Sequence, residues 1–475
     1  MLKKGIGCCL LMLTMLLGHY RLQAQAGTDT LLRLLPDEYL ALVRNFHPVM
    51  KQAGFLVSGA EAYLLASRGM FDPSIYFSTD QKTFGGTSYF NYSNTELKIP
   101  TWFGVELMAG IESNNGLRMN RSITEGQSSY AGFKVPLAKN LVMDKRRAAL
   151  QQAKLLVSQS KAERLLAVND LMFDAIGAYW NWVREYQVYK VLTDAVRINQ
   201  VRYEGIRITV EQGDRAGVDS TEALTQLLTF QAQQNEAFMR FLTAGYELSN
   251  FLWTEDEKPV LIPGNLVPGV NTDSINPFSI AYQPLNDLLQ LATVSHPKLQ
   301  SFDFKLDALE VERRLKFQSL LPTVDLKYNA LSKGYEWWKG AGAVTFDNNF
   351  KFGLDVGIPL FIRQGRGDYK AAKIKIQSTT LDRDMTRLNI ENKVRQYFNE
   401  QINLLQQLRL QERALDAYRK VLAVELMKFE LGESTLFLLN SRENKVLESQ
   451  QKVAETRAKV FKSLYGVQWA AGILR

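Results

Sequence analysis

The feature that most constrains this chain is a pair of long helical segments that meet at Gly432. The segment before this joint, from Arg366 to Leu431, contains no proline and a single glycine, Gly367, near its start. At 1.5 Å per residue such a helix is about 100 Å long, far beyond an ordinary globular helix. Two rods that return on themselves predict a spacer or a wall rather than a compact catalytic domain.

The segment after the joint carries a heptad seam, the pattern of a coiled coil. Apolar residues recur there at every seventh position: Leu439, Val446, Val453, Val460 and Val467. Ser434, just past the glycine, is predicted to cap this returning helix.

A second hairpin of the same design lies in the first half. A proline-free helical run from Val142 to Val210 is followed by a glycine-rich turn at residues 213–217. The returning helix is predicted to pack through a seam with steps of three and four. This seam consists of Leu224, Leu227, Gln231, Gln234, Phe238, Phe241, Gly245, Leu248 and Leu252. Its glutamines and glycine predict shared or shifting partners.

Several landmarks occur twice in the same order, which predicts an internal two-fold repeat. His47-Pro48 is echoed by His296-Pro297, and the glycine turn at Gly213 is echoed at Gly432. Val135-Pro136-Leu137 is echoed by Ile358-Pro359-Leu360. The offset between copies is larger for the His-Pro pairs than for the later landmarks. The first copy is therefore longer between its two strand landmarks.

The first 26 residues have the features of a secretory signal peptide, namely lysines, an apolar core and a small-residue cleavage region. Cleavage is predicted after Ala24 or Ala26. Both cysteines, Cys8 and Cys9, lie inside this segment, so the mature chain is predicted to have no thiol chemistry. Neither cysteine is at the cleavage point, which predicts that there is no lipid anchor.

The predicted mature chain is mildly basic, with 54 basic and 49 acidic residues and a net charge of +5. Without a basic block, this charge predicts no nucleic-acid partner. The predicted organisation is a signal peptide (1–26), a first repeat (27–253), a proline-rich equatorial connector (254–284), a second repeat (285–467) and a tail (468–475).

Alternating segments between the helices are predicted to be strands. From Phe350 to Leu360, apolar residues alternate with charged or small ones. This pattern is typical of a membrane barrel strand, although an amphipathic strand in a soluble sandwich has it too. Further strands are predicted at residues 74–82, 103–112, 131–137 and 324–330, with loops at 85–94 and 114–127. The aromatic group Tyr335, Trp337 and Trp338 favours a membrane interface.

About four strands per chain are too few for a closed barrel, because the smallest barrels have eight and lipid tolerates no open edge. Either strands are missing from residues 84–127, or several chains share one barrel. Two, three or four copies satisfy this argument equally.

The order of helix pair, strand pair, long hairpin and connector, followed by the same again, resembles the TolC outer-membrane efflux family over essentially the whole mature chain. The most specific matches are the two His-Pro pairs, the two strand ends at 135–137 and 358–360, and the hairpin tips. The resemblance implies a mainly α fold with membrane β structure. Long coiled-coil hairpins would form an α-barrel, and four strands per chain would complete a twelve-stranded barrel in a homotrimer.

The implied function is a passive duct of a multipartite efflux or export system in the outer membrane of a Gram-negative-type cell. The implied partners are outer-membrane lipid, a periplasmic adaptor protein and an inner-membrane transporter of the RND or ABC type. The alternative is a soluble periplasmic coiled-coil adaptor without a barrel, but such an adaptor usually carries only one long hairpin.

The resemblance places the adaptor contact and the gate at the hairpin tips. The candidate residues are Gly213, Asp214, Arg215, Asp219, Gly432, Glu433, Ser434, Asn440, Arg442 and Glu443. Asp219 matches an aspartate that helps to keep family members closed. The second tip has Leu438 and Ser441 where acidic residues are usual. Glu433, Arg442 and Glu443 are therefore predicted to supply a different charge lock. The alternative is that these charged side chains only face solvent at a helix turn.

No enzyme chemistry is predicted. The sequence has no phosphate-binding glycine loop, no clustered metal ligands and no evident nucleophile–base set, so no catalytic residue, cofactor or metal is expected. His47 and His296 both precede prolines at equivalent repeat positions, and we expect them to have a structural role at helix junctions.

Overall fold

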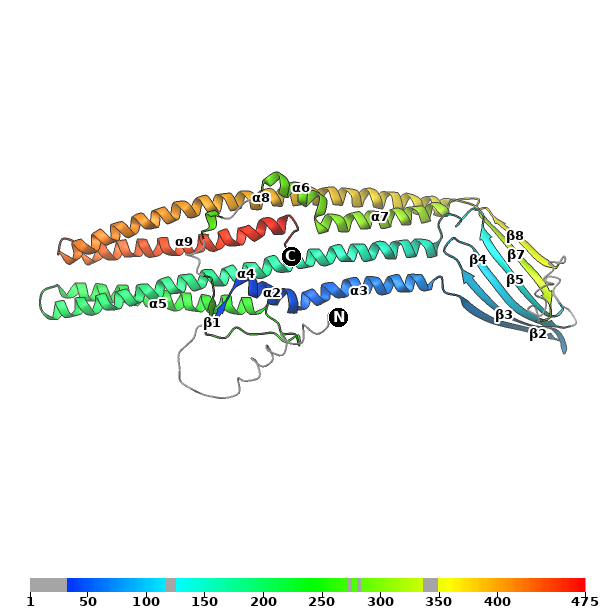
Figure 1. The fold of residues 1–475 in the computed structure, drawn as a ribbon, viewed down its shortest axis with the longest axis horizontal. Coiled ribbons are helices and arrows are strands. Elements are labelled where there is room, and N and C mark those ends of the chain that lie inside the picture. The colour runs from blue at the N-terminus through cyan, green and yellow to red at the C-terminus, as the bar shows by residue number, and fades with distance from the viewer. Residues whose placement is uncertain (1–31, 117–124, 271–275, 280–282, 336–348, 475) are drawn as a thin grey trace, which may run out of the picture.

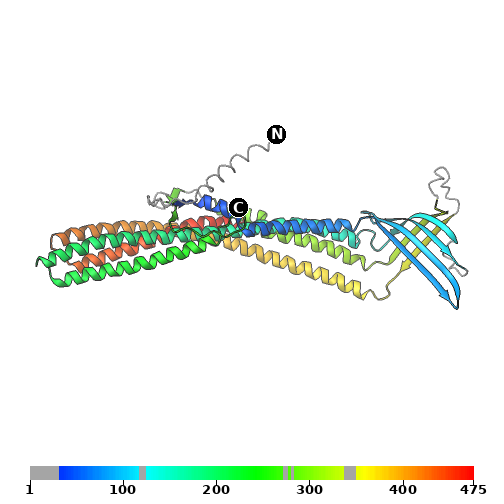
Figure 2. The ribbon, with the colours of Figure 1, turned by 90° about the horizontal axis from the view of Figure 1, so that it is seen from below.

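The computed structural model describes residues 32–116, 125–270, 276–279, 283–335 and 349–474. The molecule is a long body of helices with a curled antiparallel sheet at one end (Figures 1 and 2). The predicted signal peptide, Trp337 and Trp338 lie outside the described residues.

Two helices run the length of the helical body, α4 (Lys145–Glu211, 67 residues) and α8 (Arg363–Glu430, 68 residues). Four shorter helices pack along them: α3 (Pro48–Gly69), α5 (Gly217–Ser249), α7 (Pro297–Gln318) and α9 (Leu436–Ala470). Figure 1 shows α5 and α9 in the half that ends in the tips, and α3 and α7 in the half next to the sheet. In the described part of the chain, no helix is long and apolar enough to cross a membrane.

The order of elements recurs along the chain. The first half contains α2 (Pro36–Phe46), α3 and β2 (Ser74–Phe84) in this order. The second half contains α6 (Leu285–Ser295), α7 and β7 (Thr323–Lys333) in the same order. The two histidines occupy matching junctions. The Nδ1 atom of each accepts the backbone N–H two residues later, at 3.2 Å for His47 and 3.1 Å for His296. Their predicted structural role is confirmed.

The sheet has six strands in the order β2-β3-β4-β5-β7-β8, where about four were expected. The remaining strands are β3 (Thr87–Pro100), β4 (Glu106–Asn115), β5 (Gly126–Pro136) and β8 (Phe350–Gly357). The prediction of a loop at residues 85–94 was therefore wrong, because most of this stretch forms β3. Its asparagines and serines belong to a strand in which few side chains are apolar.

The register gives the sheet two contrasting faces. One row of apolar side chains crosses all six strands, formed by Ile75, Leu97, Ala109, Ala131, Ala330 and Phe350. On this face Phe77 is 69% exposed and Phe352 is 58% exposed. On the other face polar side chains contact one another, as in the 3.0 Å ion pair of Lys134 with Asp325. The sheet thus has an apolar face open to its surroundings and a polar inner face.

A buried aromatic cluster, which we call the waist, lies midway along the helices. It contains Tyr39, Tyr179, Trp180, Trp182, Phe241 and Phe461. Trp180 stacks on Phe461 with ring centroids 4.5 Å apart. The Tyr179 hydroxyl donates to the Leu34 carbonyl at 2.8 Å, in strand β1 (Leu32–Leu34). β1 pairs with β6 (Leu266–Pro268), so the described part of the connector packs against this region.

The two predicted seams differ in outcome. All five heptad residues of α9, from Leu439 to Val467, are buried, so that seam is confirmed. In α5, Leu227, Phe241 and Leu248 are buried as predicted, but Gln231 and Phe238 are exposed. The second column of the α5 seam lies one residue earlier and consists of Ala223, Phe230, Ala237 and Ala244. Small alanines allow α4 to approach closely, which the polar Gln231 would not favour.

Helix α9 also continues past the predicted boundary at residue 467. It ends at Ala470, and both Ala471 and Leu474 are buried. The segment that was predicted as a tail is thus largely packed into the helical body.

Candidate functional site

Both hairpins reverse through the same glycine turn. Gly213 and Gly432 have φ angles of +83° and +76°, a left-handed conformation that favours glycine. The following N–H groups, of Asp214 and Glu433, donate to carbonyls five residues earlier at 3.0 and 2.8 Å. This is the Schellman arrangement, which satisfies carbonyls at a helix end. The side chains of Asp214 and Glu433 are exposed at the extreme tips.

The start of α9 is capped by Thr435 and not by the predicted Ser434. The Thr435 hydroxyl accepts the N–H of Leu438 at 3.3 Å. Ser434 precedes the cap, and its hydroxyl instead donates to Glu425 on α8 at 2.5 Å. The corresponding N-cap of α5 is Ala216, which makes no side-chain cap. The second tip is therefore held more firmly by its own side chains than the first tip.

Glu443 lies at the centre of the strongest polar contact between the hairpins. Its carboxylate receives two bonds from Arg202 of α4, at 2.6 and 3.1 Å, and one from Asn199 at 3.1 Å. The charged side chains of Arg202 and Glu443 are only 15% and 11% exposed. A bidentate arginine–carboxylate pair of this kind gives directional as well as electrostatic stabilisation. We call this group of three residues the hairpin lock.

Arg215 makes a second contact between the hairpins. Its guanidinium group lies 4.2 Å from the ring centroid of Phe429 on α8 and donates to the Phe429 carbonyl at 3.5 Å. The same guanidinium is 3.7 Å from the carboxylate of Asp219. Asp219 thus pairs within its own tip, and it orients an arginine that reaches the other hairpin.

Polar side chains also join the two returning helices. The Asn440 amide donates to Glu222 at 3.3 Å, and the Gln226 amide donates to Asn444 at 2.9 Å. Arg442 instead contacts Glu425 at 3.9 Å, within the second hairpin. The structure therefore brings Arg215, Asn440 and Glu443 together with the opposite hairpin. It places Ser434 and Arg442 in contacts within their own hairpin.

Sequence reasoning missed the partners of these residues. Arg202, Asn199, Glu425 and Glu222 lie on helix faces that no motif marks, and Arg202 is 241 positions from Glu443. Only the three-residue spacing of Asn199 and Arg202, which puts both on one face of α4, is visible in the sequence. Nothing in that spacing names the opposing helix.

Three large apolar side chains are exposed at the tips, beside the charged Asp214 and Glu433. Val218 and Phe437, each the second residue of a returning helix, are 68% and 72% exposed, and Leu431 is 74% exposed. Below the tips, a small buried cluster consists of Ile206, Ala223, Phe429, Leu436 and Leu439. In the described chain the tips therefore combine exposed apolar side chains with a polar contact between hairpins.

Comparison with known proteins relates part of the sequence to a family and most of the fold to solved structures. Residues 288–472 match the model of the outer membrane efflux protein family. A search of curated protein sequences gives no match. The sequence match thus covers the second half of the chain.

Solved structures match nearly the whole fold. The chain is similar to the Campylobacter jejuni CmeC outer membrane channel, with 13% identity, a TM-score of 0.64, and 92% of this chain and 86% of that chain covered. The outer membrane protein VceC from Vibrio cholerae has 13% identity and a TM-score of 0.63, with 92% of this chain and 96% of that chain covered. The open state of the Neisseria gonorrhoeae MtrE outer membrane channel has 12% identity and a TM-score of 0.64, with 93% of this chain and 89% of that chain covered. The predicted resemblance to the TolC outer-membrane efflux family is confirmed.

Proposed function

We propose that this chain, whose second half matches the outer membrane efflux protein family, forms the outer-membrane duct of an efflux or export system. The observation that carries this proposal is the two-faced sheet at the end of a helical body about 100 Å long. An apolar outer face suits lipid, and a polar inner face suits a water-filled passage. The duct is passive, and its cargo passes through without chemical change.

Closure of the passage requires several copies of the chain. Among the described strands, β2 and β8 each have one neighbour, so each leaves one open edge. Unpaired backbone groups are not tolerated in lipid. Pairing β8 of one copy with β2 of the next removes every edge. The family resemblance favours three copies, located in the outer membrane with the helices extending into the periplasm.

The hairpin contacts supply a gate. In the closed state the hairpin lock and the Arg215–Phe429 contact hold the two hairpins of one chain together. Opening separates or slides these hairpins, and each contact that breaks is modest in energy. A partner that binds the separated arrangement more tightly therefore shifts the equilibrium toward the open state.

The exposed apolar side chains at the tips suit a protein partner. Val218, Leu431 and Phe437 would be covered by a periplasmic adaptor, which in turn engages an inner-membrane transporter of the RND or ABC type. A soluble adaptor role for this chain itself is less favoured. The exposed apolar face of the sheet, with Phe77 and Phe352 on it, would then be left in water.

Purification of the mature protein from the outer-membrane fraction in detergent tests this function. We expect a native mass of three chains and discrete channels after reconstitution into planar bilayers. A periplasmic monomer or dimer without channel activity would contradict the proposal and favour the soluble adaptor role instead.

A further inference from the structure

We infer that the β3–β4 hairpin is part of the membrane wall, so that three copies close a barrel of eighteen strands rather than twelve. This inference rests on the proposed trimer and concerns the width of its passage. Strands β2 and β7 occupy the same place in the two repeats, but the β3–β4 hairpin follows β2 in the first half only. It is an addition to a sheet that would otherwise have four strands.

In its half nearer the helices, the added hairpin continues both faces of the sheet. On the apolar face, Leu97 of β3 and Ala109 of β4 stand in the row that runs from Ile75 to Phe350. Ile111 of β4 extends the same face and is 39% exposed. A hairpin folded outside the wall would have no reason to match its neighbours residue for residue.

Hydrogen bonds on the polar face tie the hairpin to β5. Glu112 of β4 accepts from Tyr92 of β3 at 3.3 Å and from Ser128 of β5 at 2.9 Å. Tyr130 of β5 donates to Asn94 of β3 at 3.3 Å, across the intervening strand. Polar side chains of the hairpin thus share the inner surface with the rest of the sheet.

The turn of the hairpin presents aromatic side chains at the level expected for a membrane interface. Trp102 and Phe103 are 77% and 52% exposed, with ring centroids 5.6 Å apart. They lie at the helix end of the sheet, where Leu360 and Phe361 follow β8 and are 87% and 76% exposed. Aromatic girdles mark the two edges of the apolar band in membrane barrels.

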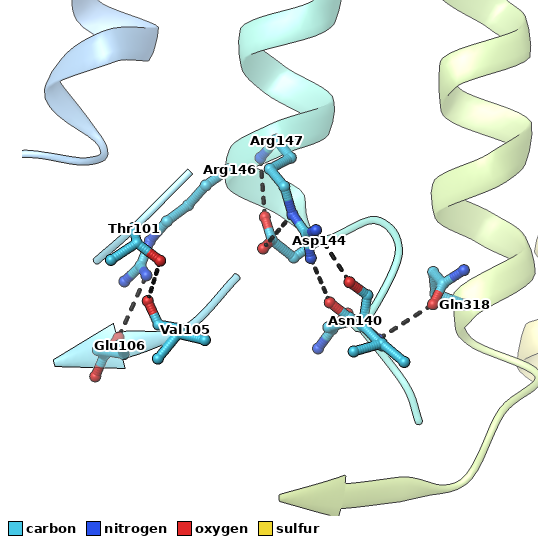
Figure 3. Close-up of polar contacts among 9 residues, drawn as sticks. Thr101, Val105, Glu106, Asn140, Asp144, Arg146, Arg147 and Gln318 are labelled. Carbon is cyan, nitrogen blue, oxygen red and sulfur yellow. Dashed lines mark hydrogen bonds and ion pairs between the residues drawn. The ribbon is translucent and has the colours of Figure 1, made fainter. Parts of the chain in front are cut away.

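The turn of the hairpin is fixed to the helical body (Figure 3). Arg146 at the start of α4 lies 3.3 Å from Glu106, the first residue of β4. The Thr101 hydroxyl donates to the Val105 carbonyl at 2.6 Å and closes the turn. Gly104 has a φ of +95°, and a Cβ there would lie 2.8 Å from the Arg147 guanidinium. The turn therefore packs directly against α4.

The helical body is wide enough to accommodate all six strands of the sheet beside it. Contacts place α3, α4, α7 and α8 side by side in this half of the molecule, and at about 8–10 Å per helix they span roughly 35 Å. Six strands at about 4.8 Å spacing and about 40° tilt span roughly 38 Å, whereas four would span about 25 Å. Eighteen strands then close a barrel about 36 Å across, against about 24 Å for twelve.

Electron cryomicroscopy of the trimer in lipid nanodiscs measures the barrel directly. We expect a trimer whose backbone diameter is about 36 Å, the width of eighteen strands. A trimer with the narrower diameter of a twelve-stranded barrel would overturn the inference and leave the proposed duct intact. A dimer, or a particle without a barrel, would overturn both.

Nitroxide labels at single cysteines test the same point without imaging, because Cys8 and Cys9 lie in the predicted signal peptide. The probes are Leu97→Cys and Glu96→Cys on β3, with Val356→Cys and Asp355→Cys on β8 as the matched reference pair. In lipid vesicles we expect oxygen to relax the labels of Leu97→Cys and Val356→Cys more strongly. A water-soluble nickel chelate should relax the labels of Glu96→Cys and Asp355→Cys more strongly.

Equal exposure of both β3 labels to the nickel chelate, with the β8 pair behaving as expected, would place the hairpin outside the wall and overturn the inference. If the two β8 labels themselves show no difference between oxygen and the nickel chelate, the result would contradict the proposed duct.

Discussion

The waist and the hairpin tips share α4, α5 and α9, but they are held together in different ways. At the waist, Tyr179 and Trp182 have no exposed surface, and the rings stack across α4 and α9. At the tips, a smaller apolar cluster, an ion pair and a few polar contacts join the hairpins, while Phe437 is 72% exposed. Local stability follows buried apolar contact, so the tips open at a lower free-energy cost than the waist. In the proposed duct, the helical body would thereby keep its shape while the tips open.

The largest expected effect comes from emptying the waist. Trp182→Ala removes a fully buried indole and should lower the free energy of unfolding by about 3–5 kcal/mol. The matched change at the tip, Phe437→Ala, should cost less than about 0.5 kcal/mol, because its side chain is exposed. Denaturant unfolding of the detergent-extracted protein compares the two. Equal losses would show that the waist is no more rigid than the tip.

The helix junction at His296, in the middle of the helical body, should also respond to acid. Burial lowers the pKa of His296 to about 4, whereas an unfolded histidine titrates near 6.5. The stability that depends on neutral His296 is complete above pH 6.5 and is lost as the pH falls toward 4, because only the unfolded chain then binds the proton. The full loss is about 3 kcal/mol.

Asparagine is a good N-cap that does not titrate, so His296→Asn should keep the cap and remove most of this pH dependence. Unfolding measured at pH 7.5 and 4.5 for both proteins tests the idea. An identical acid sensitivity in the variant would rule out His296 as its source.

Breaking the hairpin lock should loosen the tip alone. Glu443→Gln leaves the Arg202 guanidinium with a neutral partner in a largely buried site, at a cost of about 1–3 kcal/mol to the closed state. Single-channel recordings in planar bilayers should show more frequent opening. Glu448→Gln on the exposed side of α9 is the control and should show the same opening frequency as the unaltered protein. Equal behaviour of the two variants would refute the lock.

Among the changes to tip contacts between hairpins, Asp219→Ala should have a smaller effect than Glu443→Gln. Asp219 is partly exposed and lies 3.7 Å from Arg215, so its loss should weaken the contact of Arg215 with Phe429 by less than about 1 kcal/mol. We expect a modest rise in opening frequency in the same recordings. Unchanged conductance and opening would count against a gating role for this residue.

The sequence predicted the helical body better than the sheet, and the reason is physical. Glycine turns, heptad spacing and long proline-free runs fix the helices, and the predicted ends of the long helices lie within three residues of the observed ones. β3 was missed because Asn91, Ser93 and Thr95 share the face of Leu97 and Ile99, so the first part of the strand shows no alternation of apolar and polar residues. The opposite face is also partly polar, as at Asn94, which accepts a hydrogen bond from Tyr130.

For the candidate site the sequence indicated residues but not their partners, and the role of these residues stays a prediction. In the structure Glu443 and Asn440 contact the opposite hairpin. The partners come from helix faces far away in sequence, and local patterns carry no information about such contacts. The shifted seam of α5 has a related cause, because alanine spacing rather than leucine spacing determines how closely α4 approaches.

The position of α9 constrains how the molecule is made. Phe461 of α9 completes the aromatic cluster that α4 begins, and Asn169 of α4 donates to the Trp469 carbonyl and accepts the Leu474 N–H. These contacts join residues about 300 positions apart. Such distant pairings form late, since the intervening chain must first be ordered. During synthesis the apolar side of the first hairpin therefore stays uncovered until α9 has been made.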